Sequence, residues 1–187
     1  MENPYAPPQS PVDDVAGPES PSLPGGSEPA FFAVSIAKLV VLSICTLGLY
    51  ELYWYYRNWR LIKAREKTNI LPFWRAFFGY FFCYPFFVRV RDHLRPRPGD
   101  AKLAAGLLAT CWIVTSLMWR LKDPYWLVST LSFVFLIPVQ LAVNHINEVV
   151  APGHDRNSTF SAWNWMAIFL GGVLFLAAVI GTLAGWG

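Results

Sequence analysis

The sequence is short of charge: Asp, Glu, Lys and Arg make up only 14% of its 187 residues. An ordinary soluble domain carries about 25% of these residues, so this chain lacks the charge that normally coats a water-facing surface. Cysteine is scarce too, and Cys45, Cys83 and Cys111 each lie in an apolar run without a C-x-x-C pair. Disulfide frameworks and zinc sites need closely spaced thiols, so we expect these cysteines to act as small apolar residues in helix packing.

Catalytic motifs are also missing. The chain has no Ser–His–Asp order, no glycine-rich phosphate loop and no pair of carboxylates at a catalytic spacing. Its first residues lack the basic stretch, apolar run and cleavage site of a secretory signal peptide. The sequence favours a protein that is not an enzyme, and it calls for no cofactor and no metal.

Apolar and aromatic residues are abundant instead, at 55% and 17% of the chain. This composition is typical of an all-α protein that crosses a membrane several times. Residues 1–30 differ, because they contain eight prolines, five acidic residues and no base. Such a segment cannot bury enough apolar surface to offset the entropy lost on ordering. We expect a disordered, acidic, proline-rich tail over 1–30 and a helical transmembrane domain over 31–187.

Four apolar stretches predict transmembrane helices, at about 36–56, 101–119, 124–143 and 163–186. Ser35 is a suitable N-cap for the first helix, and Gly48 predicts a kink or a close helix contact within it. The short connection 120–123 predicts an antiparallel hairpin of the second and third spans. Pro138 predicts a kink in the third span.

Two further segments are rich in aromatic residues. The first, over about 57–70, predicts an amphipathic helix that lies in the membrane interface with its basic residues on one face. The second, 72–88, predicts a short re-entrant or interfacial helix, because Arg75 and Arg89 bracket only thirteen residues that include Pro85. A short spanning helix is the alternative for this segment.

The end of the first span carries the most distinctive pattern in the chain. Apolar residues give way to aromatic and then to basic residues, the order that a helix meets on leaving a bilayer. Eleven bases against four acids in residues 51–102 predict a cytoplasmic face that binds anionic lipid headgroups. The position of this face directly after an apolar span argues against nucleic acid as its partner. The residues concerned are Lys38, Gly48, Tyr50, Glu51, Tyr53, Trp54, Arg57, Trp59 and Arg60.

Glu51 is the one carboxylate in that pattern. A carboxylate near a membrane boundary is costly unless it is paired, and Arg75, Lys38 or nearby tyrosine hydroxyls are the candidate partners. An interfacial glutamate solvated by headgroups is the simpler interpretation.

A polar cluster follows the third span and includes Asn144, His145, Asn147, Glu148, His154 and Asp155. Three or four such side chains could hold a divalent metal. The H-x-x-E spacing is common, however, so capping of helix ends at a membrane surface is the favoured role.

The last span carries a stripe of small residues at four-residue spacing, Ala177, Gly181 and Gly185. This pattern lets a neighbouring backbone approach closely. We expect a partner within the chain, with homodimerisation as the alternative.

Two blocks of sequence resemble a known family. The first is F-F-A-V-S-x-x-K-L followed by T-L-G-L-Y-E-L-Y-W-Y-Y-R-N-W, and the second runs from N-H-I-N-E through P-G-H-D-R-N-S-T-F-S to Gly171-Gly172. They are similar to a group of small bacterial inner-membrane proteins known only as a domain of unknown function, with the motif T-L-G-[IL]-Y-x-L-Y-W-[YF]. The resemblance implies a multi-pass helical protein of the bacterial inner membrane, and it brings no activity.

Three functions are compatible with these patterns. The favoured one is a non-enzymatic inner-membrane protein whose basic face binds anionic lipid, a second copy or another membrane protein. The second is a small transporter or channel component, which requires polar residues along a path through the membrane. The third is a membrane enzyme acting on a lipid through residues 144–155, which requires these side chains to meet Arg89, Arg91 or His93.

Overall fold

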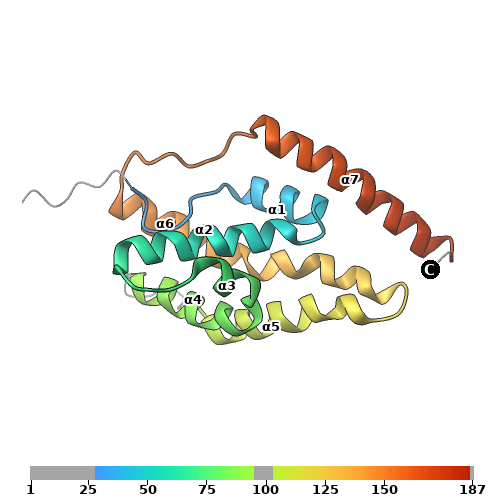
Figure 1. Cartoon of the computed structure of the whole chain (residues 1–187), viewed down its shortest axis with the longest axis horizontal. Helices are drawn as coiled ribbons and strands as arrows, with labels where there is room; N and C mark the ends of the chain where they lie inside the picture. Colours follow the sequence, from blue (N-terminus) through green and yellow to red (C-terminus); the bar gives the residue numbers. More distant parts are fainter. Residues whose placement is uncertain (1–27, 95–102, 186–187) are drawn as a thin grey trace, which may run out of the picture.

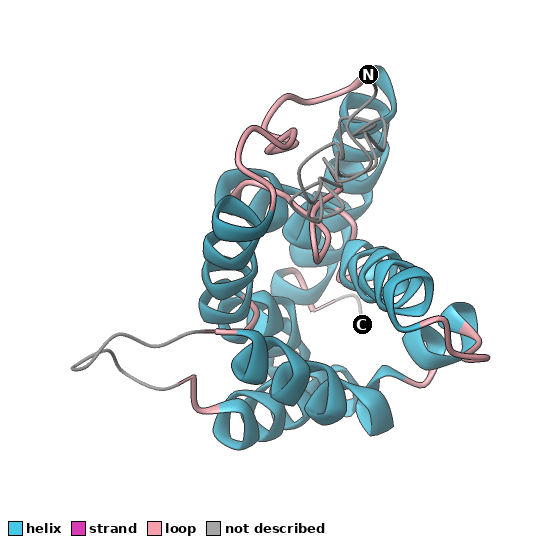
Figure 2. Ribbon diagram, turned by 90° about the vertical axis from the view of Figure 1, so that its left-hand side faces the viewer, coloured by secondary structure: helices cyan, strands magenta, loops and turns pink. Residues whose placement is uncertain are grey.

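The computed structural model describes residues 28–94 and 103–185, and these residues form helices and connecting loops without a β-strand (Figures 1 and 2). Nearly all of the predicted tail, the basic loop after His93 and Trp186 lie outside the described residues. Two helical stretches among those described are long and apolar enough to cross a membrane: Tyr125–Val150, whose most apolar 18 residues have a mean hydropathy of 2.0, and Ala162–Leu183, where the corresponding value is 2.4. The all-helical class is confirmed, whereas the prediction of four spans is wrong.

The first predicted span is two helices rather than one. Helix α1 (Ile36–Cys45) begins at Ser35, whose side chain caps it as predicted, and α2 (Leu49–Glu66) begins after Gly48. Between them Leu47 and Gly48 adopt positive φ angles of 52° and 85°, and the Gly48 N–H donates to the Ser43 carbonyl at 2.9 Å. Two consecutive left-handed residues end a helix, so the chain turns back and α2 runs beside α1 (Figure 1).

One face of helix α2 packs in the core of the protein. Its buried residues recur every three to four positions, which places them on one face of the helix. Within the segment 57–70, which was predicted to lie in the membrane interface, this buried face includes Asn58, Trp59 and Ile62, while Arg60 and residues 64–67 are exposed. The buried residues are Tyr50, Glu51, Trp54, Tyr55, Asn58, Trp59 and Ile62.

The aromatic segment 72–88 forms α3 (Pro72–Phe77) and most of α4 (Gly79–His93). Pro72 lies in the first turn of α3, where its missing N–H costs nothing. Helix α3 packs against α2, and Pro85 is accommodated inside α4. At six and fifteen residues, both helices are shorter than a membrane crossing requires.

Residues 105–150 form the predicted hairpin with different lengths. Helix α5 (Ala105–Leu117) and the 3₁₀ turn η1 (Met118–Arg120) total sixteen residues, too short for the span expected over 101–119. After the turn, η2 (Tyr125–Phe135) packs along α5 and continues into α6 (Ile137–Val150). The hydroxyls of Ser129 and Thr130 bond carbonyls three residues earlier, which suits the 3₁₀ form of η2.

Helix α7 (Ala162–Leu183) lies along one side of the bundle, and none of its residues is buried (Figure 1). It meets the tip of α1 at Gly171, where a Cβ atom would collide with the Cys45 carbonyl. Near the C-terminal end of α7, the Trp126 indole donates to the Thr182 hydroxyl at 3.0 Å. Among the described residues, the predicted stripe of small residues has no close neighbour, because a Cβ at Gly181 or Gly185 would meet nothing within 4 Å, and Ala177 is exposed.

Candidate functional site

An extended segment, Ala30–Val34, runs through the core without helical hydrogen bonds of its own. All five residues are at most 7% exposed, so their backbone groups need partners inside the protein. Asn147 pairs with both sides of Phe31: it accepts from the Phe31 N–H at 3.0 Å and donates to the Phe31 carbonyl at 2.9 Å. The Phe32 N–H donates to the Asn58 side chain at 3.0 Å.

The carbonyl groups of this segment are held by side-chain amides from three further positions. Gln140 donates to the carbonyl of Phe32, Asn157 to that of Ala33 and Asn144 to that of Val34, at 3.0–3.3 Å. These contacts join α2, α6 and the loop before α7 to one extended strand of backbone. The segment is thereby fixed as a wall of the larger of the two pockets described below.

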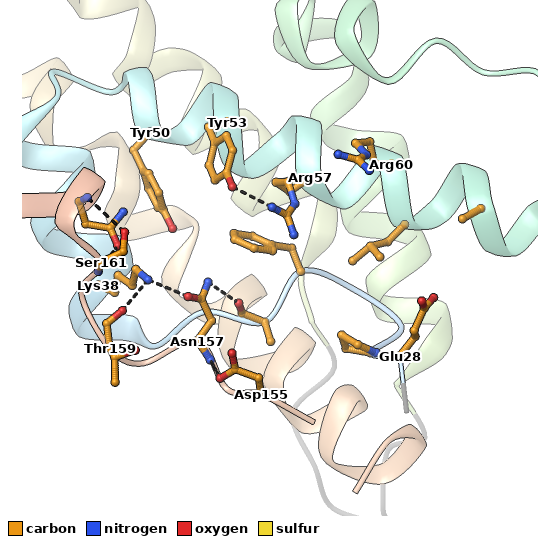
Figure 3. A pocket seen from close by; sticks show the side chains of 16 residues that line it. Glu28, Lys38, Tyr50, Tyr53, Arg57, Arg60, Asp155, Asn157, Thr159 and Ser161 are labelled. Carbon is orange, nitrogen blue, oxygen red and sulfur yellow. Dashed lines mark hydrogen bonds between the residues drawn. The ribbon is translucent and has the colours of Figure 1, made fainter. Parts of the chain in front are cut away.

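That pocket, which we call the basic pocket, has a volume of about 760 Å³. Figure 3 shows Tyr50, Tyr53, Arg57 and Arg60 of α2 along one side, with Lys38 facing them from α1. The extended segment contributes Phe32 and Ala33, Glu28 lies before it, and the loop before α7 together with the first turn of α7 contributes a last group of polar residues. The last group is Asp155, Asn157, Thr159, Ser161 and Asn164.

Three cationic side chains line the basic pocket, and within the described parts of the chain none of them forms a salt bridge. Arg57 donates to the Tyr53 hydroxyl at 2.9 Å, and its guanidinium lies 4.8 Å from the centre of the Phe32 ring. Arg60 lies 5.9 Å from the Tyr56 ring. Such aromatic contacts orient a guanidinium and leave N–H groups free for an anion.

Lys38 is held at the other side of the basic pocket. Its ammonium donates to the Asn157 side chain at 2.7 Å and to the Thr159 carbonyl at 2.8 Å. Burial lowers the pKa of the Lys38 ammonium from its usual value, and the Asp155 carboxylate raises it in part. An ammonium has three N–H donors, so one remains available for a ligand.

The two tryptophans of the predicted interface motif are core residues. Trp54 and Trp59 have no exposed surface, and Trp54 donates to Gln140 at 2.6 Å. Trp59 lies beneath two guanidiniums, with Arg75 at 4.5 Å and Arg89 at 5.5 Å from its ring. The aromatic stripe thus divides between the core and the basic pocket, and the two tryptophans do not anchor the chain in lipid.

Glu51 belongs to a second cavity, which we call the Glu51 pocket. The carboxylate is 4% exposed and accepts from the Trp112 indole at 2.6 Å and the Ser132 hydroxyl at 2.8 Å. The predicted partners Arg75 and Lys38 are both engaged elsewhere. The prediction of a glutamate solvated by headgroups is also wrong, since Glu51 is enclosed by protein.

The polar cluster after the third span does not form one site. Glu148 pairs with Arg156 at 3.2 Å, His154 contacts the Ala151 carbonyl at 2.9 Å, and Asp155 accepts from the Asn157 N–H at 2.8 Å. Asn147 holds Phe31, while His145 is exposed. Over residues 28–94 and 103–185, no group of three His, Cys, Asp or Glu side chains is placed to hold a metal.

These residues also make no hydrogen bond or salt bridge to Arg89, Arg91 or His93 within the described chain. Phe31 lies between the two groups. Its backbone N–H and carbonyl form hydrogen bonds with the Asn147 side chain, and its ring packs edge-on against the His93 ring with centroids 5.4 Å apart. An enzyme site shared by the two segments, as considered from the sequence, has no support in this geometry.

Neither a protein-family model, nor a curated protein, nor a solved structure matches this chain. The resemblance to a family of bacterial inner-membrane proteins therefore stays a prediction.

Proposed function

We propose that this chain is a multi-pass protein of the bacterial inner membrane that binds the headgroup of an anionic lipid in the basic pocket. The observation that carries the proposal is the set of three cations, Lys38, Arg57 and Arg60, that line one pocket without an ion pair among the described residues. The proposal concerns binding and involves no catalytic step.

The exposed surface of α7 supports a membrane location. This helix has 22 residues, its most apolar 18 residues have a mean hydropathy of 2.4, and none of its residues is buried. The core helix of a water-soluble protein would be covered by its neighbours, and an exposed apolar surface of this size is unfavourable in water. Lipid around α7 removes that cost.

The position of the basic pocket supports a lipid headgroup as its ligand. Ser161 and Asn164 of its lining are the N-cap and the first turn of α7, and the loop 151–161 connects the two candidate spans at this end. If both stretches cross the membrane, the pocket lies where α7 enters it. Headgroup phosphates are found at this depth, and clustered Lys and Arg residues favour the cytoplasmic side.

The lining matches an amphiphile with an anionic head. Arg57 and Arg60 present guanidiniums, which bind phosphate oxygens in pairs, and Lys38 supplies a point charge opposite them. Tyr50, Tyr53 and Phe32 provide aromatic surface beside these charges. Two carboxylates, Glu28 and Asp155, also line the pocket, so cations exceed anions by one and the pocket favours a singly charged headgroup.

Lipid retention measured by native mass spectrometry tests the proposal. The purified chain would be incubated with equal amounts of phosphatidylglycerol and phosphatidylcholine in detergent. We expect the wild type to retain phosphatidylglycerol preferentially, and Arg57→Gln/Arg60→Gln to lower that preference about tenfold, because charge-assisted hydrogen bonds to phosphate are lost.

The matched control is Arg91→Gln/Arg156→Gln, which removes the same charge from exposed positions outside the basic pocket. This variant should keep the wild-type preference. If both double variants lost the preference for phosphatidylglycerol equally, the net charge of the protein would explain the loss. That result would contradict a binding site at the basic pocket. Equal retention of the two lipids by the wild type would contradict it as well.

A further inference from the structure

The Glu51 pocket has a volume of about 280 Å³ and shares no lining residue with the basic pocket. It lies beside the turn between α1 and α2, where Leu47, Gly48 and Leu49 form part of its wall. Residues of α2, α3, α4, α5, η1 and η2 complete it, so four separate stretches of sequence (47–55, 76–80, 112–119 and 129–132) converge on one cavity.

Glu51 is the only carboxylate among the residues that line this cavity, and the lining contains no Lys or Arg. Within the described chain no salt bridge reaches it. Its hydrogen bonds from Trp112 and Ser132 come from neutral donors. Each carboxylate oxygen can accept a second hydrogen bond, so the carboxylate retains acceptor capacity for a ligand.

Two hydroxyl groups of the same lining have no hydrogen-bond partner among the described residues. They are the Tyr55 hydroxyl, on a side chain that is 1% exposed, and the Ser116 hydroxyl. Buried polar groups in folded proteins are almost always paired. One carboxylate and two unpaired hydroxyls thus belong to residues that line one cavity. The two hydroxyl oxygens are themselves covered by protein, so a ligand bearing several N–H donors would satisfy them once the covering side chains shift.

Aromatic side chains form part of the remaining wall. The Trp112 ring lies 5.1 Å from the Tyr55 ring and 5.5 Å from the Tyr80 ring, and Phe77 lines the cavity beside them. Aromatic faces attract organic cations, whereas a bare metal ion prefers a cage of oxygen ligands. The cavity is also close to the lower limit of about 300 Å³ for small-molecule pockets, far above the size of one ion.

We propose that the Glu51 pocket binds a small organic ammonium ion. Its N–H groups donate to the Glu51 carboxylate and to the Tyr55 and Ser116 hydroxyl oxygens, and its alkyl part lies against Trp112 and Tyr80. The route of entry rests on the proposed membrane location. Gly171, the tenth of the 22 residues of α7, meets the C-terminal end of α1, next to the turn that lines the cavity. If α7 crosses the membrane, the cavity therefore lies near the middle of the bilayer. An amine with an apolar body would enter it from the lipid.

Calorimetric titration of the full chain in non-ionic detergent with n-butylammonium chloride tests this proposal. We expect saturable binding to the wild type and an affinity about tenfold weaker for Glu51→Gln, because the charge-assisted hydrogen bond is lost. The matched control Glu66→Gln removes a carboxylate of the same helix that lies outside the cavity, and it should bind as the wild type does.

Two further probes identify the kind of ligand. n-Butanol has the same alkyl chain without the charge, and sodium chloride has the charge without the alkyl chain; neither should bind saturably. Absence of saturable butylammonium binding, equal binding of n-butanol, binding of sodium in its place, or an unchanged affinity in Glu51→Gln would each overturn the proposal.

Tyr55→Phe keeps the experiment decisive if Glu51→Gln does not fold. This substitution removes an unpaired hydroxyl from a buried site, so it should leave the ligand-free protein at least as stable to heat. Loss of one ligand hydrogen bond should nevertheless weaken butylammonium binding about threefold. A Tyr55→Phe variant that binds the probe as tightly as the wild type would overturn the assignment. The lipid-retention experiment uses other residues, so each proposal can fail alone.

Discussion

The side chain of Gln140 accepts a 2.6 Å hydrogen bond from the indole of Trp54, a residue 86 positions earlier in the chain. Neither residue has exposed surface. The Gln140 amide also donates to the Phe32 carbonyl at 3.3 Å and to Asn144 at 2.7 Å. One side chain thus joins α2, α6 and the extended segment that walls the basic pocket, and such a buried network stabilises a fold only while its members stay paired.

Gln140→Leu should therefore destabilise the protein strongly. The substitution leaves the Trp54 indole N–H and the Phe32 carbonyl buried without a partner, at a cost of about 2–4 kcal/mol for the two groups. Thermal unfolding in detergent, followed by helical circular dichroism, measures the effect. Asn69→Leu, at an exposed position in the loop after α2, is the control and should unfold with the wild type. A Gln140→Leu variant as stable as this control would contradict the role given to the network.

Asn147 and Glu148 are neighbours in α6 and should respond very differently to truncation. Asn147→Ala removes both hydrogen bonds to the Phe31 peptide inside the core, so we expect a loss of about 2–4 kcal/mol. Glu148→Ala removes a salt bridge whose two side chains are 74% and 50% exposed, and surface pairs contribute about 0–1 kcal/mol. The same unfolding experiment compares them. If the two variants lost equal stability, the buried hydrogen bonds of the Asn147 amide would not be the cause of the loss.

The sequence predicted features whose causes are local. Ser35 caps α1 because its hydroxyl accepts a hydrogen bond from the backbone N–H three residues later. The connection before Pro124 is short, so α5 and η2 pack side by side. Gly48 was predicted to mark a kink or a close helix contact, whereas the chain reverses its direction there. The complete reversal also needs Leu47 at φ 52°, a conformation that a bulky residue adopts too rarely to be expected from sequence.

Gly171 should tolerate no side chain, because a Cβ there collides with the Cys45 carbonyl, which belongs to rigid helical backbone. Gly171→Ala is expected to separate α7 from α1 and to lower the unfolding temperature. Gly181→Ala is the matched control in the same helix, where a Cβ meets nothing within 4 Å. It should be neutral or stabilising by up to about 1 kcal/mol through helix propensity. The opposite order of stability would contradict the packing of α7 on α1.

The buried amides of the candidate site could not be found from sequence. Asn58, Gln140 and Asn147 have partners 26 to 116 residues away, and no local pattern distinguishes them from polar residues that face water. For the same reason the sequence predicted Trp54 and Trp59 to be interface anchors. A helix that leaves a bilayer and a helix that packs in a protein core can both show this order of apolar, aromatic and basic residues. The cations of the basic pocket were identified, whereas its opposite wall, at Asn157 and Thr159, was not.

Cysteine accessibility tests whether the basic pocket lies at the cytoplasmic boundary of the membrane. Single cysteines at Thr159, beside the pocket, and at Lys122, in the turn before η2, would be placed in a chain whose Cys45, Cys83 and Cys111 are alanine. A membrane-impermeant maleimide added to intact spheroplasts should label Lys122→Cys at once and Thr159→Cys only after lysis. Labelling of Thr159→Cys in intact spheroplasts, or recovery of the chain in the soluble fraction, would contradict the account.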